Sequence, residues 1–332
     1  MKNIGVGVVG CGFVGRGAHV PGIAAIEGAT LAAVADPDSK RRTKAATKHK
    51  AQAAYEDYAD LVADPNVQAV VVSVPTPMHA KVALAAIEAG KHVLCEMPLA
   101  ANLAEVDQMI DAADRQGVYL MPGLTFRFTP NYVKAKEMLT SGAIGKPSSA
   151  LYRELIAASD LAAQWPAGSW MWDVKKSGGP LYTLSVWSID LFRWLFDTEV
   201  TSVHAAVKYT TLERFGGTLG YDCFATVQLE SGVVGCLQYS GSVADSASAS
   251  ILEVVGDSTN TIRASGNDSL TLLGEEPATT KWNLKQPGPK MWGHQQQDEY
   301  FVHCIREGET PSITPQDGRK AMELAIAIAE TL

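Results

Sequence analysis

The length, charge and cysteine content of the chain exclude several classes of protein. Its 332 residues exceed one ordinary domain and suit two, each able to bury its own core. The formal net charge of -8 argues against a nucleic-acid partner, because phosphate binding needs a basic stripe and none is visible. No apolar run reaches about 18 residues, so we expect no membrane association. The five cysteines are scattered and form no CxxC pair, which predicts a reduced, cytoplasmic protein without a metal site.

The first part of the chain, from residue 3 to about 122, alternates short apolar runs with alanine-rich helical stretches. This rhythm is typical of stacked βαβ units and predicts a doubly wound parallel sheet. The predicted strands are 4–9, 30–35, 69–74, 92–95 and 118–121, and the clearest predicted helices are 39–49 and 79–89.

The remaining part, from residue 123 onward, has a different pattern. Strands alternate with turn signals at 215–217, 230–232 and 256–257, which predicts a large, mostly antiparallel open sheet. Helices are expected near 130–141, 180–196, 293–307 and 315–331. The fold class is therefore α/β, with a parallel-sheet domain at 1–122 and a second α/β domain at 123–332.

A glycine-rich segment, "VGVVGCGFVGRG", follows the first predicted strand with G-x-G-x-x-G spacing. A helix is predicted after it, and an aspartate ends the second strand about 20 residues later. Glycines let the backbone approach a pyrophosphate, and the aspartate can accept the ribose hydroxyls of a dinucleotide. A carboxylate there would repel a 2′-phosphate, so NAD is favoured over NADP. The residues expected to contact NAD in this part are Gly10, Gly12, Phe13, Val14, Gly15 and Asp36.

Several further stretches resemble the Gfo/Idh/MocA family, the glucose-fructose oxidoreductase and inositol dehydrogenase group. They are "VPTPMHA" (74–80), "GKHVLCEMPLA" (90–100), "LTFRFTP" (124–130), "SGGPLYTLSVWSIDLFRWLF" (177–196) and "ITPQDGRKAMELAIAIAE" (313–330). The resemblance implies a Rossmann domain that binds NAD, followed by a domain for substrate binding and oligomerisation. It also implies a dehydrogenase of sugars, cyclitols or related polyols. Members commonly associate through the exposed sheet face of the second domain, and "CFATVQLE" and "VVGCLQYSG" have the alternation that such a face needs, so a homo-oligomer is expected.

The segment Glu96-Met97-Pro98 ends a predicted strand, where ligands bind in doubly wound sheets. The family has Glu-Lys-Pro here, and its lysine takes part in the chemistry beside the nicotinamide. Met97 cannot transfer a proton. The resemblance places this tripeptide at the cofactor together with Thr76 and His79, the latter as a structural cap. We expect Met97-Pro98 to be a candidate cis bond, because such bonds are cheap only before proline.

A second departure lies in the predicted helix 180–196. The family carries there an aspartate, a histidine four residues later and another aspartate after three more, and these match Thr183, Trp187 and Asp190. The spacing keeps all three on one side of the helix. With two more proton carriers absent, a working dehydrogenase would need a relocated acid-base group. The candidates are Lys175, Lys176, Tyr182 and Asp190, with Asp173 and Tyr152 also considered.

Contacts to the substrate are expected from the same segments. Trp172 could stack on a sugar ring or fill the core, and Arg127 could bind an anionic ligand or brace the joint between domains. The substrate residues are therefore Met97, Arg127, Trp172, Thr183 and Trp187. The sequence predicts an NAD-dependent oxidoreductase. Two alternatives stay open: a protein that holds NAD without redox turnover, such as a partner subunit, and an enzyme that uses bound NAD for a non-oxidative elimination or hydrolysis.

Overall fold

The computed structural model describes residues 3–274, 279–284 and 292–330, and it divides the chain into two units. Unit 1 comprises residues 1–125 and 287–320, and unit 2 comprises residues 126–286 and 321–332. Within the described ranges, no helix is long and apolar enough to span a membrane.

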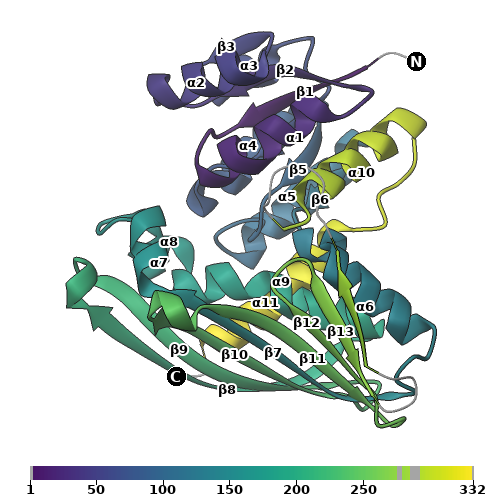
Figure 1. Cartoon of the computed structure of the whole chain (residues 1–332). Coiled ribbons are helices and arrows are strands. Elements are labelled where there is room, and N and C mark those ends of the chain that lie inside the picture. Colours follow the sequence, from purple (N-terminus) through teal and green to yellow (C-terminus); the bar gives the residue numbers. More distant parts are fainter. Residues whose placement is uncertain (1–2, 275–278, 285–291, 331–332) are drawn as a thin grey trace. The chain divides into compact units, whose positions relative to one another are not determined.

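Unit 1 is built on a parallel sheet with the order β3-β2-β1-β4-β5-β6, which is the dinucleotide-binding order (Figure 1). Its strands are β1 (Ile4–Val9), β2 (Ala29–Ala35), β3 (Ala53–Tyr55), β4 (Ala69–Val72), β5 (His92–Cys95) and β6 (Leu120–Pro122). Its helices are α1 (Val20–Ala25), α2 (Ser39–His49), α3 (Tyr58–Ala63), α4 (His79–Glu88), α5 (Leu103–Gln116) and α10 (His294–Glu307), while α11 (Pro315–Ala329) runs from unit 1 into unit 2.

Capping side chains and a left-handed glycine determine where two helices of unit 1 begin or end. The carboxylate of Asp38 accepts hydrogen bonds from two amides of the first turn of α2, and the side chain of Asn102 caps α5 in the same way. Gly117 ends α5 at a φ of 64°, a left-handed conformation that suits glycine. The central strands β1 and β4 are buried along their whole length, which explains their continuous apolar sequence.

The observed division differs from the expected one at 122/123. The sequence placed everything after residue 122 in the second domain, whereas α10 belongs to unit 1. The physical reason is a buried contact: Asp298 of α10 lies 2.9 Å from Nδ1 of His19, at the end of the π-helical turn Gly15–His19. These two residues lie 279 positions apart, so local sequence patterns carry no sign of their pairing.

Unit 2 contains a sheet with the order β14-β13-β12-β11-β7-β10-β9-β8, antiparallel except for the pairing of β7 with β10. Its strands are β7 (Pro147–Ala157), β8 (Val200–Leu212), β9 (Thr218–Leu229), β10 (Val234–Val243), β11 (Ala249–Gly256), β12 (Thr261–Ser265), β13 (Ser269–Leu273) and β14 (Thr280–Asn283). Its helices are α6 (Pro130–Thr140), α7 (Ala158–Gln164), α8 (Val174–Ser177) and α9 (Gly179–Phe196). The predicted fold class is thus confirmed.

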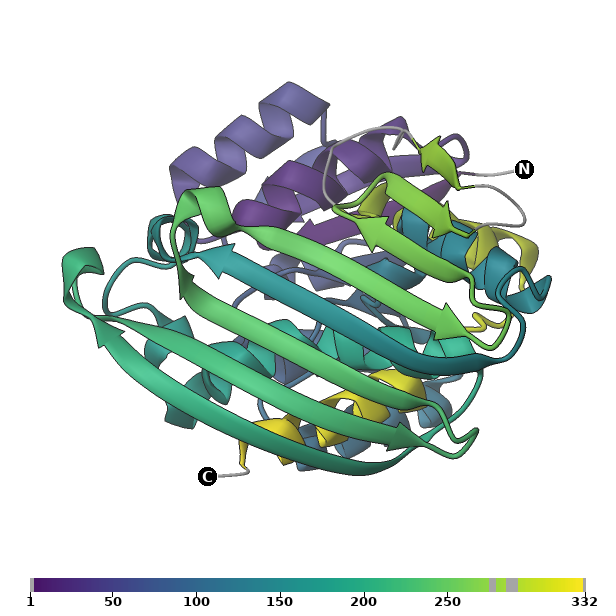
Figure 2. The ribbon, with the colours of Figure 1, turned by 60° about the horizontal axis from the view of Figure 1, so that its bottom comes forward.

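The two faces of this sheet have different environments. On the face that we call inner, the hydroxyl of Tyr239 on β10 lies 2.5 Å from that of Ser188 on α9. Helices α6 and α9 lie along this face in Figure 1, whereas Figure 2 brings the opposite, outer face toward the reader. Phe224 of β9 lies on the outer face and is 58% exposed, whereas its neighbour Cys223, paired with Tyr239, is buried. Alternation along each strand therefore assigns every sheet residue to one face.

Candidate functional site

The glycine-rich turn after β1 leaves no room for larger side chains at two positions. A Cβ atom on Gly10, whose φ is 97°, would lie 2.2 Å from the carbonyl oxygen of Ser73, and one on Gly15 would lie 1.9 Å from that of Gly10. A Cβ on Gly12 would meet nothing within 4 Å. The turn is therefore closely packed on one side and open at Gly12, which fits the approach of a dinucleotide pyrophosphate to the backbone.

Asp36 and the hydrophobic residues of the turn lie around this opening. One carboxylate oxygen of Asp36 accepts from the amide of Cys11 at 2.8 Å, and the other accepts from the amide of Asp38 at 2.8 Å. These bonds hold the carboxylate at the end of β2, where a ribose would lie. Phe13 is 53% exposed and Val14 is half-buried beside it. The sequence-predicted cofactor residues of this segment thus lie together.

A buried histidine forms hydrogen bonds to the segments that follow β4 and β5. His79 at the start of α4 has Nδ1 at 2.7 Å from the carbonyl oxygen of Pro98 and Nε2 at 2.8 Å from that of Val74. Burial lowers the pKa of His79, although the two carbonyls oppose this shift. The Met97-Pro98 bond is cis, as predicted. Thr76 is buried in the preceding turn.

The carboxylate of Glu96 points into the interior of unit 1. Its Oε1 lies 2.8 Å from Nε2 of His19 and 3.5 Å from Nε2 of His294, and Asp298 bonds the other nitrogen of His19. Burial opposes charge on the imidazole, but the two carboxylates outweigh it and raise the pKa of His19 to about 10. Burial likewise opposes ionisation of Glu96, yet the two histidines hold its pKa well below its usual range. We call these four residues the buried ion cluster.

The buried ion cluster also has the composition of a metal site. One ligand atom each from His19, Glu96 and His294 lie within 4.8 Å of one another. The cysteine pattern, from which no metal site was expected, carries no sign of this group, because its members come from β5, the π-helical turn and α10. Both ring nitrogens of His19 already lie at hydrogen-bond distance from carboxylates, so a proton can supply the positive charge that a metal would bring.

In unit 2, helix α9 carries Thr183, Trp187 and Asp190, which the resemblance matches to catalytic positions. The hydroxyl of Thr183 is buried and donates to the carbonyl oxygens of Gly179 at 2.9 Å and Ser177 at 3.3 Å. Asp190 is 1% exposed and accepts two hydrogen bonds from Arg127, at 2.6 and 2.7 Å. Arg127 and Asp190 both belong to unit 2, so this ion pair lies within that unit.

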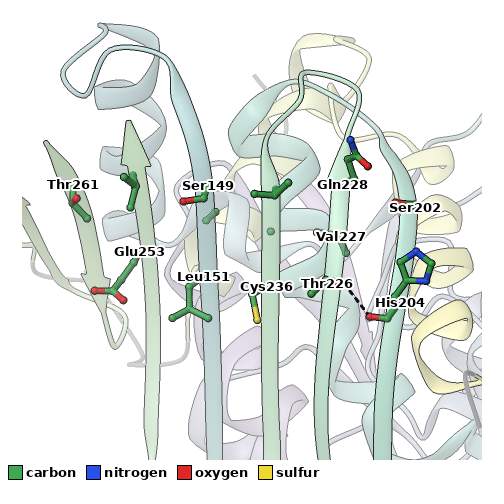
Figure 3. Close-up of a pocket in the computed structure, with 14 residues that line it drawn as sticks. Ser149, Leu151, Ser202, His204, Thr226, Val227, Gln228, Cys236, Glu253 and Thr261 are labelled. Atoms are coloured by element: carbon green, nitrogen blue, oxygen red, sulfur yellow. Dashed lines mark hydrogen bonds between the residues drawn. The ribbon is translucent and has the colours of Figure 1, made fainter. Parts of the chain in front are cut away.

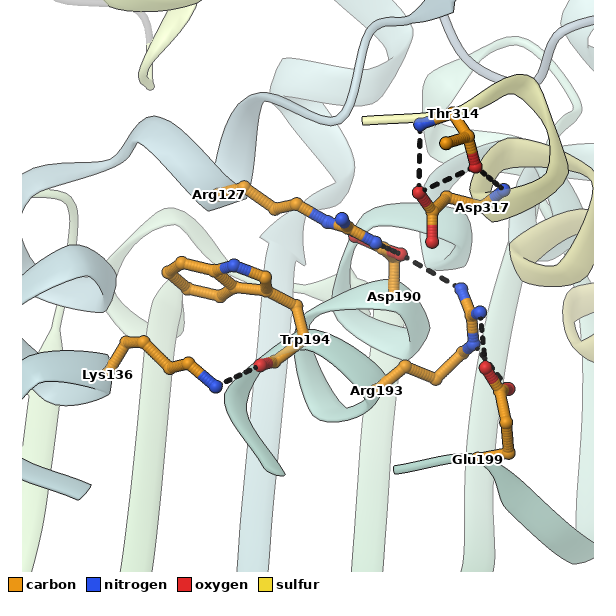
Figure 4. A network of polar contacts seen from close by, with 8 residues as sticks. All are labelled: Arg127, Lys136, Asp190, Arg193, Trp194, Glu199, Thr314 and Asp317. Carbon is orange, nitrogen blue, oxygen red and sulfur yellow. Dashed lines mark hydrogen bonds and ion pairs between the residues drawn. The ribbon is translucent and has the colours of Figure 1, made fainter. Parts of the chain in front are cut away.

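A second arginine extends this arrangement, as Figure 4 shows. Arg193 donates to Asp190 at 3.2 Å and makes a bidentate pair with Glu199 at 2.7 and 2.8 Å. The Asp190 carboxylate lies between two guanidinium groups, which stabilise its ionised form and oppose its service as a proton carrier.

The other proposed catalytic and substrate residues of unit 2 lie on α9 or in the segment that precedes it. Lys175 and Lys176 are exposed on the short helix α8, and Lys176 pairs with Asp173 at 2.9 Å. Trp172 is half-buried and donates its indole hydrogen to the carbonyl oxygen of a neighbouring loop residue at 2.8 Å. Tyr182 is buried, and Trp187 is half-buried on α9.

A carboxyl group that the sequence reading missed lies on β7. Glu154 pairs in register with Tyr239 and follows Tyr152 by two residues, so its side chain belongs to the inner face. Burial raises the pKa of Glu154 to about 7. The adjacent Arg153 bonds Gln238 across the outer face. The sequence has a positive charge at Arg153 and a negative charge at Glu154. Only the pairing register of β7 determines that Glu154 is the one on the inner face.

The outer face of the sheet carries a shallow hollow of about 730 Å³ (Figure 3). It lies on the face opposite to α9 and contains none of the predicted site residues. Its lining is mixed polar and apolar and includes Ser149, Leu151, His204, Thr226, Gln228, Cys236, Glu253 and Val255.

Comparison with known proteins agrees with this geometry. Residues 4–124 match the model described as "Oxidoreductase family, NAD-binding Rossmann fold", and residues 132–261 match the "GFO/IDH/MocA C-terminal domain". The chain belongs to the Gfo/Idh/MocA oxidoreductase family. Its cofactor is NAD.

Individual relatives of this Gfo/Idh/MocA protein cover nearly all or most of it. It is 28% identical to the myo-inositol 2-dehydrogenase of Thermotoga maritima, over 98% of this chain and 96% of the relative. It is 32% identical to the levoglucosan dehydrogenase of Pseudarthrobacter phenanthrenivorans, over 69% of this chain and 60% of the relative. A solved structure of a probable dehydrogenase from Thermotoga maritima superimposes with a TM-score of 0.81 at 27% identity, covering 99% of this chain and 96% of that one.

Proposed function

We propose that the protein is an NAD-dependent dehydrogenase of a sugar, cyclitol or related polyol. The observation that carries the proposal is the glycine turn, closed at Gly10 and Gly15 and open at Gly12, with the Asp36 carboxylate fixed at the end of β2. These residues fit the pyrophosphate and ribose of NAD. NAD, when bound, supplies a hydride acceptor. The substrate class follows from relatives named as dehydrogenases of inositol and levoglucosan.

The chemistry that we propose needs a proton carrier other than the usual residues. Met97 has no titratable group, and the Thr183 hydroxyl is committed to two backbone carbonyls. Trp187 has no basic nitrogen, and Asp190 is held between two arginines. Lys175 and Lys176 on α8 and Tyr182 on α9 remain candidates, but both lysines are exposed to solvent. The proposed enzyme therefore uses a non-standard proton-transfer group.

The proposal also covers the cellular location and the oligomeric state of the enzyme. All five cysteines lie in the described part of the chain and are free, which supports a reducing, cytoplasmic location. We infer a homo-oligomer that forms through the outer face of the sheet, because large apolar side chains are exposed there.

The experiment is an assay of the reduced-nicotinamide absorbance with NAD and a panel of inositols, anhydrosugars and simple sugars. Turnover of at least one compound is expected. Tight NAD binding without turnover would favour the alternative of a protein that only holds the dinucleotide. The loss of titratable side chains at positions 97, 183 and 187 is the observation that supports this alternative. Product formation without net cofactor change would favour a non-oxidative reaction such as elimination or hydrolysis.

A further inference from the structure

Glu154 lies on the inner face of the sheet in unit 2, beside the helix that carries the family's catalytic positions. It is on β7, between the paired residues Tyr239 of β10 and Ser250 of β11. Tyr239 contacts Ser188 of α9, one residue after Trp187. The carboxyl group therefore lies on the sheet face that α9 covers.

Glu154 is half-buried, and its environment differs from that of the fully buried carboxylate of Asp190. Among the described residues it has no hydrogen-bond or ion-pair partner, whereas Asp190 is held by two arginines. The titratable groups around it are tyrosine hydroxyls, whose pKa values are raised mainly by burial and further by the Glu154 carboxylate. They come from three strands and α6 and are Tyr132, Tyr152, Tyr221 and Tyr239. A half-buried carboxyl without a protein partner stays open to solvent and to a ligand, and groups with shifted pKa values are more common at functional sites than elsewhere.

We propose that Glu154 is the proton-transfer residue of this enzyme, replacing the lysine, aspartate and histidine of the family. This inference rests on the dehydrogenase function proposed above and identifies the group that function requires. Two observations carry it: the unpaired carboxyl on the inner face, and the commitment of Thr183 and Asp190 to other partners.

The step balances with NAD as the oxidant. A secondary alcohol of the substrate gives its hydroxyl proton to the Glu154 carboxylate, and the carbon–oxygen bond becomes a carbonyl as the carbinol hydrogen leaves as hydride. Bound NAD would accept this hydride and with it the two electrons that the substrate loses, and the glutamic acid returns its proton to water. A base with a pKa of about 7 is suited to this exchange near neutral pH, since it accepts a proton and releases it with little cost in either direction.

The test compares Glu154→Gln with the unmodified enzyme on a substrate found in the absorbance assay. Glutamine keeps the shape of a protonated glutamate but accepts no proton. Asp222→Asn is the matched control, because Asp222 is a carboxylate on β9 that lies on the outer face and accepts a hydrogen bond from Ser240. NAD binding and thermal unfolding are measured for every variant, and Glu154→Asp provides a second variant should glutamine disturb folding.

We expect Glu154→Gln to lower kcat about 10²- to 10⁴-fold, with little change in NAD binding, and Asp222→Asn to be unaffected. The kcat/KM of the unmodified enzyme should rise with pH through an apparent pKa near 7, and this rise should be absent in the variant. Formate should restore part of the activity of Glu154→Ala, which a merely structural role would not allow.

Three results would overturn the assignment. If Glu154→Gln keeps its kcat within about threefold of the unmodified enzyme and keeps its pH profile, the proposed role of Glu154 is refuted. The proposed dehydrogenase function is not affected by that result. The role of Glu154 is also refuted by a combination of two results. These are a folded, NAD-binding Glu154→Asp variant with an unchanged pH profile and a Glu154→Ala variant that formate does not rescue. Absence of turnover by the unmodified protein on every polyol refutes the proposed function, and the role of Glu154 falls with it.

Discussion

We propose that the preference for NAD over NADP depends on a single carboxylate, that of Asp36. Asp36 accepts amides from Cys11 and Asp38 and is thereby fixed at the end of β2, where it can accept ribose hydroxyls. We expect Asp36→Ala to weaken NAD binding about 10- to 100-fold, as for the loss of a hydrogen bond to a charged group, and to affect NADP less. Calorimetric titration with both dinucleotides measures the two changes.

The matched control for this prediction is Asp38→Asn. Asparagine caps helices as well as aspartate does, so this change should leave α2 and NAD binding intact. A preference of the unmodified protein for NADP would contradict the assignment of Asp36.

At the level of the element, the stability of α9 depends on its network of charges. Asp190 neutralises two largely buried guanidinium groups, and Asp190→Asn would leave both without that charge. Breaking such a buried pair typically costs about 3–5 kcal/mol. We expect a loss of this size in urea unfolding of the Asp190→Asn variant.

The comparison variant for α9 is Glu137→Gln on α6, whose partner Lys134 is an exposed neighbour. An exposed pair contributes little, so this change should cost about 0.5 kcal/mol or less. Similar losses for the two variants would show that the Asp190 network contributes no more than a surface ion pair.

The attachment of α10 to the Rossmann sheet should weaken at alkaline pH. The folded pKa of His19, about 10, is raised above its ordinary value of 6.5. The stability that this pairing contributes is therefore fully present below pH 6.5 and is lost as the pH rises through 10. We expect Asp298→Asn to reduce the free energy of unfolding at pH 7, with the difference from the unmodified protein shrinking by about 1–3 kcal/mol at pH 10. A difference that stays constant over this range would mean that His19 is not protonated in the fold.

The same cluster permits a test of the expectation that no metal is bound. Its geometry would accept a cation, but a proton on His19 already supplies positive charge between two carboxylates. We expect elemental analysis of the purified protein to find far less than one equivalent of zinc, and chelation to leave the unfolding temperature unchanged. A full equivalent of zinc that is lost in a His294→Ala variant would contradict the prediction.

For the molecule as a whole, local patterns in the sequence were enough to predict the elements but not their long-range contacts. The bounds of β1, β5 and α2 were predicted correctly, because buried parallel strands are continuously apolar and α2 has an aspartate cap. The short β3 was missed, since its three residues bury little and leave no apolar run. The place of α10 depends on the His19–Asp298 contact, and the inward direction of Glu154 depends on strand register. Neither the His19–Asp298 contact nor the strand register can be predicted from the residues next to each other in the sequence.

The outer face of the sheet in unit 2 supports the last prediction, which concerns assembly. Phe224, Val234 and Val255 are 58%, 53% and 40% exposed there, although isolated domains seldom leave large apolar side chains grouped on one sheet face. We expect the unmodified protein to sediment as a multiple of its 35.4 kDa mass, and the double variant Phe224→Lys with Val234→Lys to sediment as a single chain. Charges introduced on both copies would meet across a symmetric interface and repel.

The control for assembly is Gln116→Lys, which adds a positive charge at the exposed end of α5 in unit 1 and should leave the sedimenting mass unchanged. Retention of secondary structure by circular dichroism distinguishes loss of assembly from loss of folding. Were the unmodified protein to sediment as one chain at every concentration, the outer face would have to serve another purpose. Were the double variant to remain fully assembled, the interface would lie on another surface, because paired lysines cannot be buried at its centre without a large cost.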